Sequence, residues 1–324
     1  MERTNVVWNL TRLCPFSCSF CCVSATYVRG FQQIHPVDDN SPIIDGELSF
    51  NQQMEVIEQL DGNEFKIDFS GGDVLINPRN IDLILIASEK FGAENIGLSI
   101  PGTFTTPQTL KRLSGKISNV EITMDNIPGI SDPHRPLNYA KYASLAIERL
   151  VDAGFSVGVQ TVLRRENMLK GVMTKLHNHL QILGVQKWSF LQFAPVGRGY
   201  GKYESLSTNY EYREFSDVLK QITRGSALEV HYQYLMPLRE EREFRCRAVN
   251  HSIGITPEGK VSACFWAFKP NGELFDEVVL GKVPEENIVD ILRSEKARQW
   301  SSYGGNGGKE NYCPLRDILK GVKI

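Results

Sequence analysis

The 324-residue sequence contains no apolar run near the roughly 20 residues that a helix needs to span a bilayer. It has no apolar stretch of signal-peptide length before Cys14, and its formal net charge is only −2. The first two absences argue against a membrane span and predict no export signal. The small net charge gives no electrostatic basis for binding nucleic acid or a membrane surface. We therefore expect a cytoplasmic protein, in a compartment that keeps thiols reduced.

Cysteine is scarce over most of the chain but concentrated at two places. The segment CPFSCSFCC (14–22) holds four of the seven cysteines, and the others are Cys246, Cys264 and Cys313. An odd number argues against a purely disulfide-bonded framework, and clustered thiols in a reducing compartment favour metal binding. The spacing C-x3-C-x2-C places three thiolates on one tight loop, which can hold three irons of a [4Fe–4S] cluster and leave the fourth open. A zinc knuckle is the alternative, although no histidine follows within the next dozen residues.

Hydrophobic periodicity alternates between strand and helix over the first 195 or so residues. Strands are predicted at 5–11, 65–69, 95–100, 119–125, 155–163 and 187–193, and helices at 48–60, 80–92, 106–115, 139–154 and 168–184. Such alternation implies parallel strands, in either an open doubly wound sheet or an incomplete barrel. The cysteine segment and SGGD (70–73) both directly follow strands, where a barrel carries its chemistry. This favours an α/β fold with a partial (β/α)6 barrel.

After residue 205 the pattern changes. We predict a partial barrel for residues 1–205, a linker helix region for 206–240 and a small α+β domain for 241–324. The last part is expected to hold a β-hairpin turning at TPEGK (256–260), a helix near 286–300 and a glycine-rich link at 301–308. Its cysteines follow C-x12-G-x4-C from Cys246 to Cys264, so the hairpin can hold two thiolates side by side.

These motifs resemble the radical S-adenosylmethionine (SAM) enzymes. The resemblance rests on the cysteine triplet after the first strand, with Phe20 before its third cysteine, and on four further segments: SGGD (70–73), EITMDN…DPHRP (121–136), TVLRREN (161–167) and PVGRG (195–199). It implies that Cys14, Cys18 and Cys21 hold a [4Fe–4S] cluster. The residues that it implies for SAM binding are Phe20, Gly71, Gly72, Asp73, Asp125, Asn167 and Arg198. Asp73 stands where this family usually has glutamate.

The spacing of the later cysteines is similar to the opening half of a SPASM or twitch domain, which binds an auxiliary iron–sulfur cluster. A full SPASM set has seven cysteines in this region, and here there are three. The resemblance therefore implies at most one auxiliary [4Fe–4S] cluster, held by Cys246, Cys264 and Cys313 with a fourth ligand that is not cysteine. The alternative is three buried thiols that serve only packing.

The resemblance also implies a reaction. One electron, from a donor such as flavodoxin or ferredoxin, cleaves SAM to a 5′-deoxyadenosyl radical that abstracts a hydrogen atom from the substrate. The auxiliary cysteines favour oxidation, by crosslink, thioether or dehydrogenation, of a ribosomally made peptide. A radical SAM epimerase or dehydrogenase acting on a peptide residue or on a sugar or aminoglycoside is an alternative, and so is a non-catalytic iron–sulfur or zinc scaffold. Cys22 is either a buried thiol or a hydrogen-atom donor, and the segment 23–47 is a candidate substrate lid.

Overall fold

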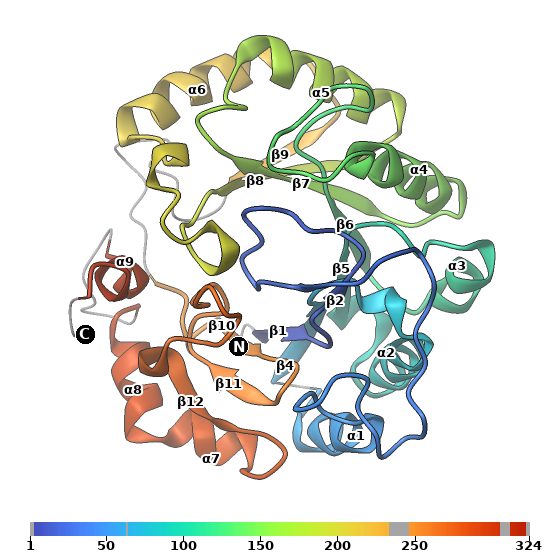
Figure 1. Cartoon of the computed structure of the whole chain (residues 1–324), viewed down its shortest axis with the longest axis vertical. Helices are drawn as coiled ribbons and strands as arrows, with labels where there is room; N and C mark the ends of the chain where they lie inside the picture. The colour runs from blue at the N-terminus through green and yellow to red at the C-terminus, as the bar shows by residue number, and fades with distance from the viewer. Residues whose placement is uncertain (1–2, 63, 233–245, 305–311, 322–324) are drawn as a thin grey trace.

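The computed structural model describes residues 3–62, 64–232, 246–304 and 312–321. Its centre is a curved sheet of parallel strands with helices around the outside (Figure 1). The parallel strands are β1 (Thr4–Asn9), β4 (Phe65–Ser70), β5 (Ile96–Ile100), β6 (Asn119–Thr123), β7 (Val157–Leu163), β8 (Lys187–Gln192) and β9 (Glu229–Tyr232). From β1 to β9 they lie side by side in chain order, without the reversal that defines a doubly wound sheet. The predicted partial barrel is therefore confirmed.

The barrel helices begin and end largely where the sequence predicts. They are α1 (Phe50–Gln59), α2 (Pro78–Phe91), α3 (Pro107–Leu113), α4 (Tyr139–Asp152), α5 (Lys170–Ile182) and α6 (Asn209–Ile222). The side chain of Ser49 accepts from Gln52 N and closes a capping box at the start of α1. Gly92 ends α2 with a φ of +84°, a conformation that costs glycine little.

The alternation along β4 sets the character of the barrel interior. Phe65, Ile67 and Phe69 are buried against the surrounding helices, whereas Lys66, Asp68 and Ser70 line the cavity inside the barrel. Because successive strand side chains point to opposite faces, one strand supplies both the apolar core and a polar lumen. The barrel therefore encloses a cavity suited to a polar ligand.

The C-terminal region joins the same sheet. Its elements are β10 (Ser252–Ile255), β11 (Lys260–Ser262), β12 (Val279–Lys282), α7 (Ile288–Arg293), α8 (Glu295–Ser302) and α9 (Pro314–Ile318). β10 and β11 form the predicted antiparallel hairpin, and β10 also pairs parallel with β1, with Val6 opposite Ile253. The single helix predicted near 286–300 is wrong, because Ser294 ends α7 and caps the start of α8.

The segment predicted as a linker helix, 206–240, contains α6 and β9. The strand β9 pairs parallel with β8 and extends the barrel sheet, which the sequence did not predict. Residues 233–240 and most of the predicted glycine link, 305–308, lie outside the described residues. Among the helices that the structure describes, none has the length and apolar character needed to cross a membrane.

Short elements place the loops at the mouth of the barrel. A two-stranded parallel ribbon pairs β2 (Leu13–Cys14) with β3 (Thr26–Tyr27) at the two ends of the cysteine loop. The 3-10 turns are η1 (Val74–Ile76), η2 (Ala93–Asn95), η3 (Gly197–Gly199), η4 (Tyr203–Ser205) and η5 (Asp276–Val278). Of these, η1 follows β4 and η3 follows β8, so both lie beyond the carboxyl ends of barrel strands.

Candidate active site

The first cysteine loop is folded back on itself by backbone hydrogen bonds. Val28 donates to the carbonyl oxygen of Cys14 at 2.9 Å, and Cys21 donates to that of Cys18 at 3.3 Å. The N–H of Ala25 approaches Cys21 Sγ at 3.4 Å. These contacts bring Cys14, Cys18 and Cys21 to one wall of the barrel cavity.

The environment of these thiols suits a metal-bound thiolate better than a free one. Burial raises the pKa of Cys14 and of Cys18, although the guanidinium of Arg135 beside Cys18 acts in the opposite direction. A thiolate at such a position needs a positive charge that replaces its proton, and iron supplies one. Three thiols on one loop, all facing a cavity, are a donor set that fits three irons of a [4Fe–4S] cluster.

Gly71 and Gly72 pack against the chain that leads into the cysteine loop. Gly72 donates to Thr11 O at 2.8 Å, and a Cβ at position 71 would lie 2.5 Å from that same oxygen. A Cβ at position 72 would collide with the carbonyl oxygen of Leu13. Both glycines also line the cavity. Only glycine lets the backbone at positions 71 and 72 come this close to residues 11–13. The same two residues present their backbone to a ligand in the cavity.

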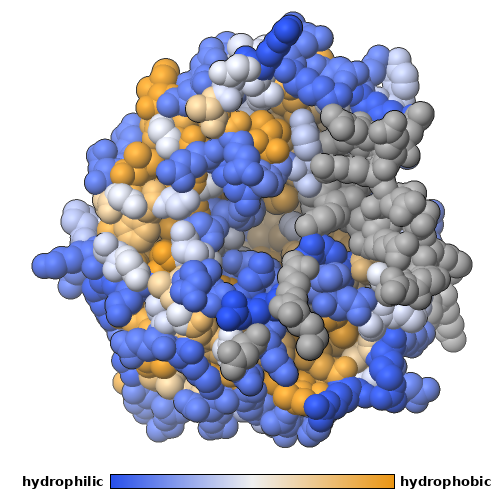
Figure 2. All heavy atoms as spheres, turned by 180° about the vertical axis from the view of Figure 1, so that it is seen from behind, coloured by the Kyte–Doolittle hydropathy of each residue, from blue (hydrophilic) through white to orange (hydrophobic). Residues whose placement is uncertain are grey.

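A single cavity of about 1330 Å³ runs through the barrel, and all seven cysteines line it. Figure 2 shows the molecule hollowed at its centre on the face opposite that of Figure 1. The cysteine triplet lies on the barrel side of the cavity, and Cys246, Cys264 and Cys313 lie on the side of the C-terminal region. A ligand inside the cavity therefore has access to both cysteine sets.

Cys246, Cys264 and Cys313 come from three separate segments of the chain and pack against one apolar cluster. Burial raises the pKa of Cys246 to about 11, and the nearby Cys313 adds to this effect. Within the described residues no three His, Cys, Asp or Glu side chains are arranged for a single metal ion. An iron–sulfur cluster needs no such convergence, because each thiolate binds a different iron.

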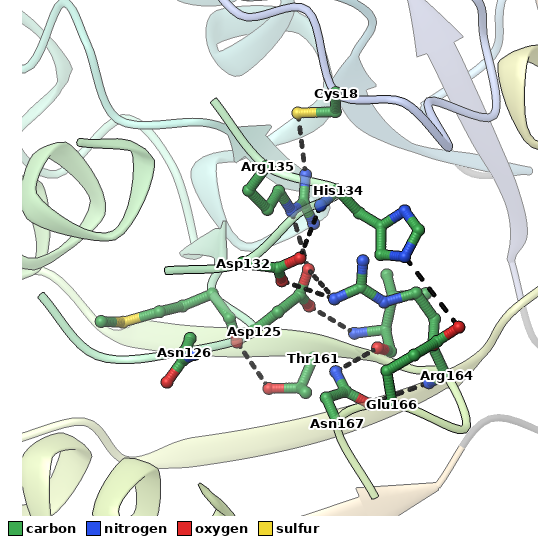
Figure 3. Close-up of polar contacts among 12 residues, drawn as sticks. Cys18, Asp125, Asn126, Asp132, His134, Arg135, Thr161, Arg164, Glu166 and Asn167 are labelled. Carbon is green, nitrogen blue, oxygen red and sulfur yellow. Dashed lines mark hydrogen bonds and ion pairs between the residues drawn. The ribbon is translucent and has the colours of Figure 1, made fainter. Parts of the chain in front are cut away.

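Arg135 connects the triplet to the loop that follows β6, and the sequence alone did not mark it as a site residue. Its Nη1 donates to Cys18 Sγ at 3.2 Å and its Nε to Asp125 Oδ2 at 2.7 Å (Figure 3). Asp125 also accepts from Val162 N at 2.8 Å and is fully buried. The buried ion pair fixes the guanidinium beside a cysteine of the triplet.

Two guanidinium groups lie against the ring of Phe20. The Cζ atoms of Arg135 and Arg164 lie 4.5 and 4.4 Å from the centre of its ring. Arg164 is itself buried and forms an ion pair of 2.5 Å with Asp132. Two cation–π contacts therefore hold Phe20 at the cavity wall, immediately before Cys21.

Three of the residues implied for SAM binding, Asp73, Asp125 and Asn167, have side chains that accept hydrogen bonds within the protein. Asp73 accepts from Leu75 N at 3.1 Å and from Thr103 Oγ1, and burial raises its pKa to about 6. Asn167 Oδ1 accepts from Arg164 N, so it caps its own loop. Neither residue lines the cavity, and nor does Asp125. Their part in SAM binding stays a prediction.

Cys22 and Arg198 both line the cavity. Cys22 packs against the apolar cluster of the C-terminal region, unlike its three neighbours in the loop, and burial raises the pKa of its thiol to about 12. Of the candidate lid 23–47, only Val23 and Ala25 line the cavity, and Ile34 N donates instead to Ile76 O in η1. The role of this segment as a substrate lid stays a prediction.

A partial barrel with a cavity between two cysteine sets defines a class of iron–sulfur enzyme, and comparison with known proteins identifies its family. The radical SAM superfamily model matches residues 8–170, about half of the chain. The model of the SPASM iron–sulfur cluster-binding domain matches residues 246–315. The chain belongs to the radical SAM superfamily and has a C-terminal SPASM domain. Its cofactors are accordingly a [4Fe–4S] cluster, SAM and an auxiliary iron–sulfur cluster.

Individual relatives are distant. Fe-coproporphyrin III synthase of Methanosarcina barkeri is 24% identical over 225 residues, which are 69% of this chain and 52% of that protein. Streptococcus suis SuiB bound to the precursor peptide SuiA matches with a TM-score of 0.69 at 14% identity, over 91% of this chain and 65% of SuiB. The enzyme anSMEcpe with bound AdoMet matches with a TM-score of 0.66 at 14% identity, over 92% and 82%. The chain thus spans about half of the first relative and two thirds of SuiB, and the structural matches establish the fold alone.

Proposed function

We propose that this protein is a radical SAM enzyme that oxidatively modifies a ribosomally made peptide, forming a crosslink, a thioether or a new double bond. The observation that carries the proposal is the single cavity lined by all seven cysteines. When bound, the reduced cluster and SAM supply one-electron cleavage of the sulfonium and removal of a hydrogen atom from the substrate. A second cysteine set facing the same cavity supports an oxidised product, because it provides a place for the electron that the substrate loses.

The residues have separate parts in this proposal. Cys14, Cys18 and Cys21 hold the SAM-binding cluster, and Cys246, Cys264 and Cys313 hold the auxiliary one. The backbone at Gly71 and Gly72 and the ring of Phe20 form the wall against SAM. The chain itself orients the target carbon and keeps water out, which lowers the entropic part of the barrier. The electron donor is a cytoplasmic flavodoxin or ferredoxin.

A peptide substrate is supported by the likeness to SuiB, which binds a precursor peptide. Epimerisation of a peptide residue is the second candidate, and Cys22 favours it. Its thiol lines the cavity outside the triplet, at a place from which a hydrogen atom can return to a substrate radical. Product mass separates the two reactions, since oxidation removes two hydrogens and epimerisation leaves the mass unchanged in light water.

The proposal is tested without knowledge of the substrate. Anaerobically reconstituted protein is reduced with dithionite in the presence of SAM, and 5′-deoxyadenosine is measured by mass spectrometry. We expect turnover in the wild type, none in the Cys14/Cys18/Cys21→Ala variant, and wild-type turnover in Ser17→Ala, which changes an exposed residue of the same loop. No 5′-deoxyadenosine from wild-type protein with full iron content would overturn the proposal in favour of a non-catalytic scaffold.

A further inference from the structure

Arg198 occupies a position between the two cysteine sets. It lies in η3, directly after β8, and its backbone N–H donates to the carbonyl oxygen of Cys21 at 3.0 Å. The preceding N–H, of Gly197, donates to Phe268 O in the C-terminal region at 2.8 Å. These two hydrogen bonds connect η3 to the cysteine loop and to the C-terminal region. They therefore fix the backbone position of Arg198.

The guanidinium of Arg198 has one edge occupied and one edge without a partner. Its Nη1 donates to Ala25 O at 2.8 Å. Its Nε and Nη2 are buried and have no hydrogen-bond partner among the described residues. These two nitrogens form the side of the fork that binds both oxygens of a carboxylate. A buried unpaired donor is costly, and a bound acceptor removes that cost.

The charges around Arg198 agree with an anionic ligand. The other arginines that line the same cavity are Arg135 beside Cys18, Arg213 in α6, Arg247 next to Cys246 and Arg316 in α9. Among the described lining residues, the acidic ones are Asp68 and Glu121, both on barrel strands away from η3. Asp68 accepts from Asn5 at 2.7 Å, and Glu121 pairs with Lys187 at 3.4 Å. Arginines therefore outnumber acidic residues among the described residues that line the cavity.

We propose that the Nε–Nη2 edge of Arg198 binds a carboxylate of the substrate and so holds the substrate between the two cysteine sets. The inference rests on the proposed function and names its substrate class, a carboxylate-bearing molecule such as an acidic peptide. SAM also carries a carboxylate. Arg198 nevertheless lies in η3 after β8, whereas Gly71 and Gly72 follow β4, and three strands of the sheet separate β4 from β8.

The test compares two probe peptides on the anaerobically reconstituted holoenzyme. One is a short acetylated peptide amide with two glutamates and a neutral fluorophore, and the other carries glutamine in their place. Binding is measured by fluorescence anisotropy, and SAM binding is measured in parallel by equilibrium dialysis. The variants are R198Q, R198K and R224Q, the last an exposed arginine outside the cavity lining that controls for net charge. Equal iron content shows that each variant has folded.

We expect wild type and R224Q to bind the glutamate peptide about tenfold more tightly than the glutamine peptide, as a charge-assisted fork allows. In R198Q the ratio of the two peptide affinities should fall to about one, and in R198K it should be intermediate. The SAM affinity of R198Q should stay within about twofold of wild type. A ratio near one in the wild type, or a ratio unchanged in R198Q, overturns the inference. A tenfold loss of SAM affinity in R198Q with an unchanged ratio assigns the carboxylate to SAM and also overturns it. Failure of wild-type SAM cleavage instead overturns the proposed function, whatever the peptide ratio.

Discussion

Gly197 packs directly on the backbone of Cys21. A Cβ built at position 197 would collide with the carbonyl oxygens of Cys21 and Cys22, and Gly197 also has a φ of +53°. The residue thus brings η3 into contact with the cysteine loop, while its N–H reaches Phe268 on the other side of the cavity. Contact between the two cysteine-bearing regions at this point depends on the absence of a side chain.

Gly197→Ala should therefore damage the triplet site. The left-handed backbone alone costs alanine about 1–2 kcal/mol, and the collision with two carbonyl groups forces the loop to move. We expect lower thermal stability and a loss of iron from the SAM-binding cluster, measured by calorimetry and by iron analysis. Gly201→Ala is the matched control, because its φ is +82° but a Cβ there meets nothing within 4 Å. Equal effects of the two substitutions would show that the contact with the loop is unimportant.

Gly304→Ala should act on the other cysteine set. A Cβ at this position would collide with the carbonyl oxygen of Cys246. We expect the auxiliary iron to be lost and the SAM-binding cluster to remain, so that iron falls from about eight to about four per chain. Gly171→Ala, where a Cβ meets only open space, should keep the full content. Full iron in Gly304→Ala would contradict the assignment of Cys246 to a cluster.

The Arg135–Asp125 pair should matter more to stability than a surface pair. Arg135→Met leaves the fully buried carboxylate of Asp125 without its main charge partner. Breaking a buried pair in this way costs about 3–5 kcal/mol. Arg79→Met removes contacts to Asp39 and Asp82 at the surface and should cost no more than about 1 kcal/mol. Urea unfolding of both variants measures the difference, and similar values would contradict this description of the pair.

We expect the buried carboxyl group of Glu47 to make the free energy of unfolding depend on pH. Burial raises its pKa to about 7, although it accepts from Arg12 N at 2.7 Å. The folded protein therefore holds this proton more tightly than the unfolded chain, and the stability that the neutral form provides is lost as the pH rises from about 4.5 to about 7.

Relative to wild type, Glu47→Gln should gain at most about 3 kcal/mol between those pH values, since one pKa unit corresponds to about 1.4 kcal/mol. Urea unfolding at several pH values measures this gain. Glu58→Gln, a change at a carboxylate that is 74% exposed, should show no such trend. A constant stability difference between Glu47→Gln and wild type across this range would contradict the raised pKa.

Local signals carried most of what the sequence predicted. The Ser49 cap, the end of α2 at Gly92 and the TPEGK hairpin depend on neighbouring residues and could be predicted from them. The strand β9 could not, because its four residues EVHY are no more than half-buried and show no clear alternation. The pairing of β10 with β1 joins residues about 250 positions apart, and no local pattern indicates it.

The site shows the same division. The spacing of Cys14, Cys18 and Cys21 indicated a shared loop, and the structure brings them to one cavity. The contacts of Arg135 and Arg164 with the ring of Phe20 could not be predicted, because they join residues more than 110 positions apart. Asp73 and Asn167 matched family motifs, yet their side chains accept hydrogen bonds within the protein and do not line the cavity. A sequence motif can therefore identify candidate residues. Which of them face the cavity depends on contacts between distant parts of the chain.

The central claim is that the two cysteine sets hold two separate iron–sulfur clusters at one cavity. Iron, zinc and sulfide content after anaerobic purification tests it most directly, beside the Cys14/Cys18/Cys21→Ala variant. We expect about eight irons per wild-type chain with matching sulfide, and about four in the variant. Stoichiometric zinc without sulfide in the wild type would contradict the claim.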